Sequence, residues 1–404
     1  MSSSSSGLLG KIQEYSVPLI AGVFAALYAA NAHPDWYHHV NETPLLPFDI
    51  LGHPVTLHFL VNDLFMVLFF GIAAKEITDA VLPGGSLNPP SKAVNPLLGT
   101  LGGVLGPVGV FLLLVGVFYG GAENYAAVAN GWGVPTATDI ALAWLVARLV
   151  FGAKHPAVNF LLLLAVADDA IGLGIIAVAY PDPAHPVAPG MLGFTALGMV
   201  VALVLRKRDV RSWLPYILVG GGLSWYGLIM AHLHPALALV FIVPFLPAEI
   251  PQMGLITEEE DRPGADPVHH DTPLERFEHT LKAPVDWGLF FFAFSNAGVA
   301  FANIGDLTWA ILGALIVGKT LGIFLFSFVG SKIGFPLPEG MDSKTLGMAG
   351  LVAGLGLTVA LFVSAQAYTD AALQGEAKMG ALFSGGVAIL ALVLGRMLRI
   401  QRID

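Results

Sequence analysis

Two adjacent carboxylates, Asp168 and Asp169, lie inside an otherwise apolar run that extends over residues 161–177. The run has the composition of a membrane-spanning helix, and an ionisable side chain at that depth costs roughly 3 kcal/mol or more. About seven apolar or small residues precede the pair and about eight follow it, which disfavours a location at the membrane interface. We therefore interpret the pair as part of an ion-transport or proton-relay site whose partners lie elsewhere in the chain.

The composition is that of a polytopic membrane protein. Of the 404 residues, 55% are hydrophobic and only 12% are charged, and the mean hydropathy is +0.74. A soluble domain of this length would not have these values. No basic patch indicates a nucleic-acid partner. The chain has no cysteine, which excludes disulfides and thiolate metal sites.

Apolar segments of about 17 to 25 residues, separated by polar or Pro- and Gly-containing breaks, predict the membrane spans. We count twelve, so the expected fold is an all-α polytopic membrane protein with a single transporter domain over residues 1–404. The eighth span is short and opens at Pro235, so we expect it to be tilted or irregular. The predicted spans are 14–32, 61–82, 96–119, 132–150, 157–179, 188–206, 213–231, 234–248, 284–302, 307–331, 345–368 and 377–397.

Lysine and arginine concentrate at alternate connections between the spans, as expected for the cytoplasmic side of a membrane. This bias predicts that both termini are cytoplasmic, and it leaves Lys378 as the only lysine or arginine on the opposite face. Within the spans, Lys75 lies near a cytoplasmic end, so its side chain can extend to the interface. Lys319 cannot easily do so, because long apolar stretches flank it on both sides.

Two segments lie outside the predicted spans. In the external residues 46–60, alternating apolar residues on either side of Gly52 predict a short β-hairpin. An isolated hairpin is marginally stable in water, so we expect it to lie on the membrane surface or to pair with a second copy in a homodimer. The cytoplasmic loop 250–272 is rich in acidic residues, proline and histidine, which predicts a solvated connection. His269 and His270 leave a pH-responsive or metal-binding role open.

Span four contains residues that interrupt a helix. Gly133 and Pro135 precede Thr138 and Asp139, so backbone carbonyls are freed close to a hydroxyl and a carboxylate. We therefore expect a broken helix at this position.

Span eleven has a corresponding interruption, in which Gly354 and Gly356 precede Thr358. Spans three to five are predicted to begin at the cytoplasm, whereas spans ten to twelve begin outside. Equivalent broken, crossed helices in two oppositely oriented triplets indicate an inverted-repeat secondary transporter with its site near mid-membrane. The alternative for span eleven is that its glycines only serve helix packing.

These residues together suit a small cation such as sodium or lithium. Asp139, Asp168 and Asp169 supply hard oxygen ligands, and Thr138 with the loosened backbone supplies neutral ones. Lys319 is the natural counter-charge. Desolvation raises the pKa of a carboxylate and lowers the pKa of a lysine, whereas the attraction between the two charges opposes both shifts. The cluster can therefore exchange protons near neutral pH. A carrier that changes its facing only when loaded with a cation or with protons must exchange the two.

Several stretches of the chain resemble the NhaA-type sodium/proton antiporters in order and spacing, over nearly the whole length. They are VNDLFMVLFFGIAAKE, GWGVPTATDIALA, LLAVADDAIGLGIIA, FFFAFSNAGV, IVGKTLGIFLF and the glycine-rich span eleven. The resemblance implies an electrogenic antiporter of the bacterial inner membrane, with both termini cytoplasmic and no cofactor. It also implies that two protons move inward for each sodium or lithium ion that moves outward.

The resemblance further assigns roles to individual residues. It makes Asp169 the main metal-ion ligand and Asp168 the partner of Lys319, while Thr138 and Asp139 compensate the dipoles of the broken helices. The external hairpin corresponds to the dimer contact of the family. A response to pH is implied for Glu76, Arg276, Glu278 and His279 near the cytoplasmic funnel.

The sequence following Glu76 departs from the pattern of the family. An acid is often followed there, after two residues, by a base and a second acid, whereas this chain has Ile77, Thr78, Asp79 and Ala80. The departure lies outside the residues of the predicted ion site. It affects the residues that the resemblance implies in pH response, so the working pH of this chain is not predicted.

Three other functions are alternatives. A sodium-coupled symporter of an organic anion would share the broken-helix fold but dispense with a central lysine. An intramembrane aspartyl protease could pair Asp139 with Asp168, but it leaves Asp169 and Lys319 without a role. A passive channel fits poorly, because paired buried acids indicate tight binding and slow turnover. The chain is therefore not expected to be an enzyme.

Overall fold

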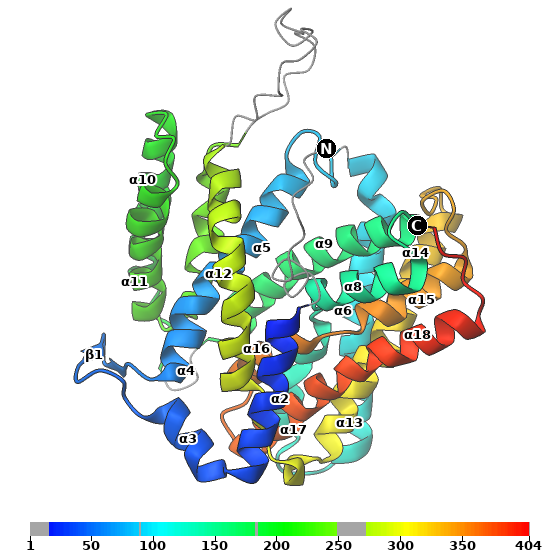
Figure 1. The fold of residues 1–404 in the computed structure, drawn as a ribbon, viewed down its shortest axis with the longest axis horizontal. Coiled ribbons are helices and arrows are strands. Elements are labelled where there is room, and N and C mark those ends of the chain that lie inside the picture. Colours follow the sequence, from blue (N-terminus) through cyan, green and yellow to red (C-terminus); the bar gives the residue numbers. More distant parts are fainter. Residues whose placement is uncertain (1–15, 89, 182–184, 249–271, 404) are drawn as a thin grey trace, which may run out of the picture.

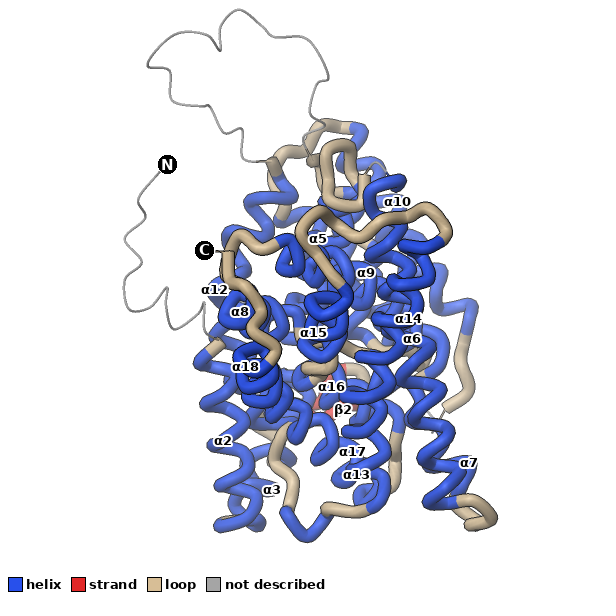
Figure 2. Tube along the Cα trace, turned by 90° about the vertical axis from the view of Figure 1, so that its right-hand side faces the viewer, coloured by secondary structure: helices blue, strands red, loops and turns tan. Residues whose placement is uncertain are grey.

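The computed structural model describes residues 16–88, 90–181, 185–248 and 272–403. The described chain is mostly helical, and its helices pack against one another, some of them roughly parallel and others inclined to these (Figures 1 and 2). All of the predicted loop 250–272 except Thr272 lies outside the described residues, so its interpretation stays a prediction.

Twelve spans are predicted, and within the described residues six helical stretches are by themselves long and apolar enough to cross a membrane. Several of them are continuous rods in which α-helix alternates with a short π- or 3-10 segment. Their components are α4 (Leu57–Phe59), η1 (Leu60–Phe65) and α5 (Met66–Val81); α6 (Pro90–Tyr119); α9 (Pro156–Ala179); η3 (Pro189–Met191) and α10 (Leu192–Lys207); α13 (Asp306–Gly313), η8 (Ala314–Gly318) and α14 (Lys319–Lys332); and α17 (Ala371–Phe383), η9 (Ser384–Gly386) and α18 (Val387–Met397).

Two further stretches reach membrane length only as bent pairs, which raises the number of possible crossings to eight. The first pair joins α7 (Tyr125–Ala129) and η2 (Asn130–Thr136) to α8 (Ile140–Phe151), and the second joins α15 (Ser343–Ala353) to α16 (Leu357–Ala367). Shorter apolar helices are α2 (Val17–Ala32), η4 (Tyr216–Gly221) with α11 (Gly222–Met230), and η5 (Pro235–Phe241) with η6 (Val243–Phe245). The eighth predicted span therefore consists of 3-10 helix, which confirms that it is irregular.

The helix α12 (Pro273–Asn296) differs most from its predicted bounds of 284–302. It begins earlier because Thr272 and Glu275 form a capping box, in which each side chain bonds the other residue's backbone N–H at 3.2 Å. Its first turns are highly charged, so hydropathy alone does not include them in a span. The second half of this helix packs against α2, for example at Gly22, which lies against Phe290 and Ala293 (Figure 1).

Glycines bring α6 into close contact with η8 and α14. A methyl group added at Gly318 would lie 2.6 Å from Pro107 Cα, and one at Gly106 would lie 2.8 Å from Gly322 Cα. Only glycine lets the two backbones approach this closely, as is common between membrane helices. The contact places Lys319, the first residue of α14, against the centre of the bundle.

Residues 46–60 contain a minimal antiparallel pair of strands, β1 (Asp49–Ile50) and β2 (His53–Pro54). The two turn residues, Leu51 and Gly52, have φ values of 51° and 86°, which suits a two-residue hairpin turn. The predicted second arm is too long, because Leu57–Phe59 is helical. Thr56 ends the extended segment, since its hydroxyl caps α4 by accepting the Phe59 N–H at 3.1 Å. Another short helix, α3 (Pro34–Glu42), precedes the strands, and η7 (Phe301–Asn303) follows α12.

Candidate functional site

The first bent pair breaks within span four, just after Pro135. The axes of Tyr125–Thr136 and Ile140–Phe151 differ by 52°, and Ala137 and Asp139 between them have extended backbone. Proline removes a backbone donor, so carbonyls before it lose helical partners. At the end of η2, the Thr136 hydroxyl donates to the Gly133 carbonyl at 2.8 Å. The predicted break in span four is therefore confirmed.

The second bent pair, α15 and α16, breaks at residues 354–356 with a bend of 48°. Glycine suits this break, because a methyl group at Gly354 would lie 2.7 Å from the Leu315 carbonyl oxygen and one at Gly356 would lie 3.0 Å from the Ala137 carbonyl oxygen of the other break. At its far end, α15 begins at a capping box. There the hydrogen bond from the Thr345 N–H holds the pKa of the Asp342 carboxyl below its usual range.

The two breaks lie directly against each other and share hydrogen bonds. The Asp139 N–H donates to the Leu355 carbonyl at 2.6 Å, and the Thr138 hydroxyl donates to the Ala353 carbonyl at 3.1 Å. Carbonyls freed at the end of α15 are therefore satisfied by span four, as buried backbone groups require. Gly354 lies between these two carbonyls in the chain and ends α15.

The Asp139 carboxylate caps the second halves of both broken spans. Its Oδ1 accepts the Leu142 N–H of α8 at 3.0 Å, and its Oδ2 accepts the Thr358 hydroxyl of α16 at 2.9 Å and the Thr358 N–H at 3.3 Å. A negative charge at two helix N-termini is favourable, because each terminus carries unpaired N–H groups and a partial positive charge.

The capping of two helices is the role that the resemblance implies for Asp139. Both of its oxygens accept hydrogen bonds from helix ends, and its predicted part as an oxygen ligand beside Asp168 and Asp169 stays a prediction. Within the described residues, no three carboxylates or histidines are close enough together to hold a metal ion.

Lys319 is completely buried, with 0% of its surface exposed. Its Nζ lies 2.8 Å from Asp168 Oδ2 and also donates to the Thr136 carbonyl at the end of η2. The ammonium therefore neutralises a buried carboxylate and compensates the negative end of a helix at the same time. The structure thus brings together Lys319, Asp168 and the break in span four.

The remaining carboxylate oxygens near this pair have no bonded partner in the described part of the chain. Asp168 Oδ1 is buried and accepts no hydrogen bond, and the half-buried Asp169 forms neither a hydrogen bond nor an ion pair among these residues. Asp169 is close enough to Asp168, Asp139 and Lys319 to interact with them electrostatically. Oxygens of this kind, beside the Thr138 hydroxyl, can ligate a small hard cation.

A second group of charged residues lies near the C-terminal end of α5. Lys75 is buried and bonds both Glu278 of α12 and Asp79, the latter at 2.6 Å. Two carboxylates therefore hold the Lys75 ammonium in place, and its predicted extension to the interface stays a prediction. Glu76 is half-buried and interacts electrostatically with this group and with Asp169.

Two of the residues implied in pH response are not brought to this group. The side chains of Arg276 and His279 are exposed on α12 and make no hydrogen bond or ion pair within the described ranges. Sequence reasoning also gave Lys75 no partner. The spacing of Lys75 and Asp79, one helical turn apart, could have indicated that pairing.

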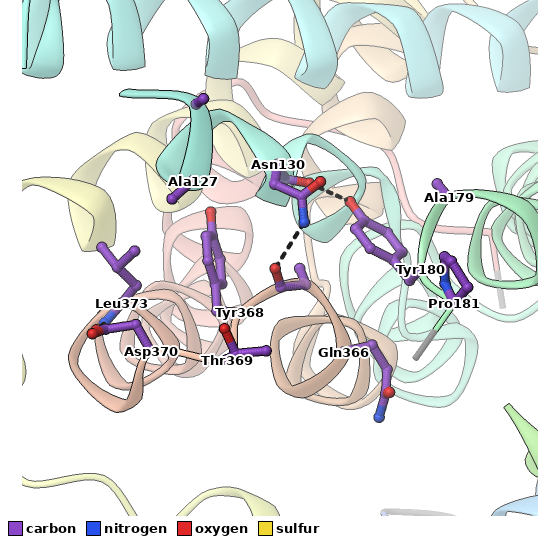
Figure 3. A pocket seen from close by; sticks show the side chains of 12 residues that line it. Ala127, Asn130, Ala179, Tyr180, Pro181, Gln366, Tyr368, Thr369, Asp370 and Leu373 are labelled. Atoms are coloured by element: carbon purple, nitrogen blue, oxygen red, sulfur yellow. Dashed lines mark hydrogen bonds between the residues drawn. The ribbon is translucent and has the colours of Figure 1, made fainter. Parts of the chain in front are cut away.

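A pocket of about 320 Å³ lies between α7, the end of α9 and the end of α16 (Figure 3). The Tyr180 hydroxyl donates to the Asn130 carbonyl at 2.9 Å and accepts the Gly133 N–H at 2.8 Å. Asn130 Nδ2 donates to the Ala367 carbonyl at 2.9 Å, and the Tyr368 hydroxyl donates to a carbonyl of α7 at 2.8 Å. These side chains tie the first half of span four to its neighbours. Sequence reasoning missed both tyrosines, although each directly follows an apolar helix.

Comparison with known proteins gives a match over nearly the whole chain. The sequence profile of a family described as Na+/H+ antiporter 1 matches residues 9–398. The protein named Na(+)/H(+) antiporter NhaA from Geobacter sulfurreducens is 59% identical over 392 residues, which cover 97% of this chain and 98% of that protein. Its namesake from Geobacter metallireducens is 57% identical over 392 residues, with the same coverage of both chains.

A solved structure also overlaps with the described fold. It is the sodium proton antiporter MjNhaP1 from Methanocaldococcus jannaschii at pH 8, with a TM-score of 0.47 and 12% sequence identity. The overlap covers 97% of this chain and 94% of the other. A TM-score of this size is too low to establish a shared fold.

Proposed function

Because the chain belongs to the Na+/H+ antiporter 1 family, we propose that it exchanges sodium or lithium ions for protons across a bacterial cytoplasmic membrane. One observation carries the proposal at the level of residues. The buried ion pair of Lys319 and Asp168 adjoins the unbonded carboxylate of Asp169 where two helix breaks meet. The names of the related proteins, which are Na(+)/H(+) antiporters, support the same exchange.

In the proposed site, oxygens of Asp169, Asp168 and Thr138 bind the transported cation. The cation requires Asp169 to be ionised, so it competes with a proton for that carboxylate. When Asp168 turns toward the cation, Lys319 loses its partner and releases a second proton, since an unpaired buried ammonium is unfavourable. Two protons then exchange for one sodium or lithium ion, which makes the transport electrogenic.

The proposed cycle is alternating access around this fixed site. The breaks of span four and span eleven supply the polar backbone at mid-membrane, and each facing is reached when the site holds either the cation or protons. Asp139 keeps both second halves capped throughout, which supports a role in positioning rather than in binding the ion.

The proposed topology has twelve crossings with both termini in the cytoplasm. It counts the eight stretches of membrane length, the three shorter apolar helices and α12, whose charged first turns would project from the membrane. Spans three to five and ten to twelve would then form inverted repeats that each contain one bent pair. Under this topology, α3 and α17 lie at the outer end, which is the lower end in Figure 2.

Purified protein in lipid vesicles with an imposed proton gradient tests the function. We expect that adding sodium or lithium will dequench an interior pH-sensitive dye, because cation entry drives protons out of the vesicle. Potassium is the control ion and should have no effect. A response that required an organic anion would instead support a symporter and contradict the proposal.

We further propose a homodimer through residues 46–60. Replacing residues 48–54 by a short Gly-Ser linker removes both strands and keeps Thr56, which caps α4. We expect the variant to be monomeric in detergent while retaining transport in vesicles, because β1 lies at the edge of the molecule, away from α8, α9 and α16 (Figure 1). Size-exclusion chromatography with light scattering measures the mass. If this variant remains a dimer, the proposed dimer contact is wrong.

A further inference from the structure

Tyr180 is a buried tyrosine that has no part in the exchange described above. It directly follows α9, the helix that carries Asp168 and Asp169, and only 3% of its surface is exposed. Its hydroxyl donates to the Asn130 carbonyl at 2.9 Å (Figure 3) and accepts the Gly133 N–H at 2.8 Å. A single hydroxyl at the end of α9 therefore holds two backbone groups of span four.

These two hydrogen bonds bridge one turn of η2. In a 3-10 helix the N–H of each residue bonds the carbonyl three positions before it, and Asn130 and Gly133 have this spacing. The hydroxyl lies between the two groups where η2 is kinked, since Gly131 has a non-helical ψ of 17°. A polar group that enters the hydrogen-bond ladder of a helix is one of the causes of a kink. The Tyr180 hydroxyl therefore contributes to the shape of η2.

The Tyr180 ring fits directly against the backbone of η2. A methyl group added at Gly133 would lie 2.7 Å from the Tyr180 hydroxyl oxygen and 2.8 Å from the ring atom Cε2. The Trp132 ring lies beside the tyrosine, with the ring centroids 6.3 Å apart. Because no side chain separates the ring from the backbone at Gly133, a shift of one is passed directly to the other.

The bridge lies about one turn from a group of the ion site. Gly133 precedes Thr136 by three residues, or roughly 6 Å of 3-10 helix, and the Thr136 carbonyl accepts the Lys319 ammonium. Along α9, Tyr180 follows Asp168 by twelve residues, or roughly 18 Å of α-helix. The helix that carries the aspartates is therefore tied to span four at a second level, far from their carboxylates.

We propose that Tyr180 is a positioning residue that determines the affinity of the ion site for the cation. By holding η2, its hydroxyl keeps the Thr136 carbonyl against Lys319 and keeps Thr138 beside the aspartates of α9. Ligands of a small cation must be held to within about 0.5 Å, and the groups that bond their supports provide this precision. This inference rests on the proposed function, in which Thr138 and the two aspartates bind sodium.

Tyr180→Phe removes both hydrogen bonds and keeps the ring. The pocket of about 320 Å³ that Asn130 and Tyr180 line can admit water to the bridge, so we expect the variant to fold. Water in an open pocket does not have the fixed position of a hydroxyl on a buried ring. The variant should therefore hold η2 less firmly without unfolding it.

The test measures the half-saturating sodium concentration and the maximal rate of proton release in vesicles, and the thermal midpoint as sodium is added. For Tyr180→Phe, we expect the half-saturating concentration to rise about tenfold, as the loss of an outer-shell partner implies. The thermal stabilisation should require correspondingly more sodium. A role in stability alone would lower the midpoint without sodium and the amount of active protein, but it would leave the half-saturating concentration unchanged.

Tyr216→Phe is the matched control. Tyr216 is fully buried in another part of the hydrophobic core, and its hydroxyl donates to the Val210 carbonyl at 3.2 Å. Removing this hydroxyl should leave the half-saturating sodium concentration unchanged. Gly133→Ala is an independent variant whose added methyl displaces the Tyr180 hydroxyl, so it should raise that concentration even if Tyr180→Phe fails to fold.

An unchanged half-saturating sodium concentration in Tyr180→Phe or in Gly133→Ala would overturn the inference. An equal rise in Tyr216→Phe would overturn it as well, because the effect would then belong to any buried hydroxyl. Wild-type vesicles without any sodium-dependent proton movement would instead refute the proposed function.

Discussion

Asp169→Asn is expected to abolish sodium-dependent proton release. The substitution keeps the shape of the side chain and removes its charge. Sodium and protons can then no longer compete for this carboxylate, so the exchange stops. No other carboxylate near the breaks is free of bonds on both oxygens, because Asp139 caps two helices and Asp168 bonds Lys319. The loss should be complete, within detection, in the vesicle assay.

Thermal unfolding measures binding independently of transport. Sodium should stabilise the wild-type protein by RT ln(1 + [L]/Kd), so the midpoint should rise with sodium concentration. This stabilisation should weaken at acid pH, because protons then occupy the carboxylate that binds the cation. Asp169→Asn should show no sodium-dependent shift at any pH.

Asp168→Asn is the matched control, since it changes the adjacent residue in the same way. It should mainly lower the free energy of unfolding or the number of protons moved in each cycle, because the Asp168 carboxylate forms an ion pair with the Lys319 ammonium at 2.8 Å. If Asp169→Asn still binds sodium with the pH dependence of the wild type, the hypothesis that sodium and protons compete for this single carboxylate is wrong.

Lys319→Ala is expected to lower the free energy of unfolding by about 3–5 kcal/mol, because it leaves the buried Asp168 carboxylate without its partner. It also removes the donor to the Thr136 carbonyl at the end of η2. If Asp168 takes up a proton and the protein remains folded, the charge moved in each cycle should change instead. Thermal unfolding and electrical recordings on a solid-supported membrane measure these two outcomes.

The double variant Asp168→Asn, Lys319→Gln separates the two explanations. Removing both charges leaves no unpaired ion in the interior, so it should recover much of the stability lost in Lys319→Ala. An unchanged thermal midpoint together with unchanged electrogenicity in Lys319→Ala would contradict both roles of the lysine.

The features that the sequence predicts well are those determined by neighbouring residues. Hydropathy gives the long helices, and glycine and proline give the two breaks, because both effects act within a few turns. The Asp168–Lys319 pair could be anticipated for another reason. Few ionisable residues lie inside apolar spans, and opposite charges at that depth require each other.

The features that could not be predicted depend on contacts across the whole chain. Lys75 and Glu278 are 203 positions apart, so no local pattern indicates that α12 will hold the Lys75 ammonium. The double cap formed by Asp139 needs Thr358, which lies 219 positions away. The early start of α12 was missed because charged residues near Thr272 mask a helix that its capping box begins.

The glycine contact between α6 and α14 limits what can move in this molecule. Where two backbones touch there is no side chain between them that can rotate or repack, so we expect α6 and α14 to move together. Lys319 begins α14, so we expect its backbone to keep its position relative to α6. When the transporter changes its facing, we therefore expect the aspartates of α9 to move relative to Lys319, while Lys319 stays in place beside α6.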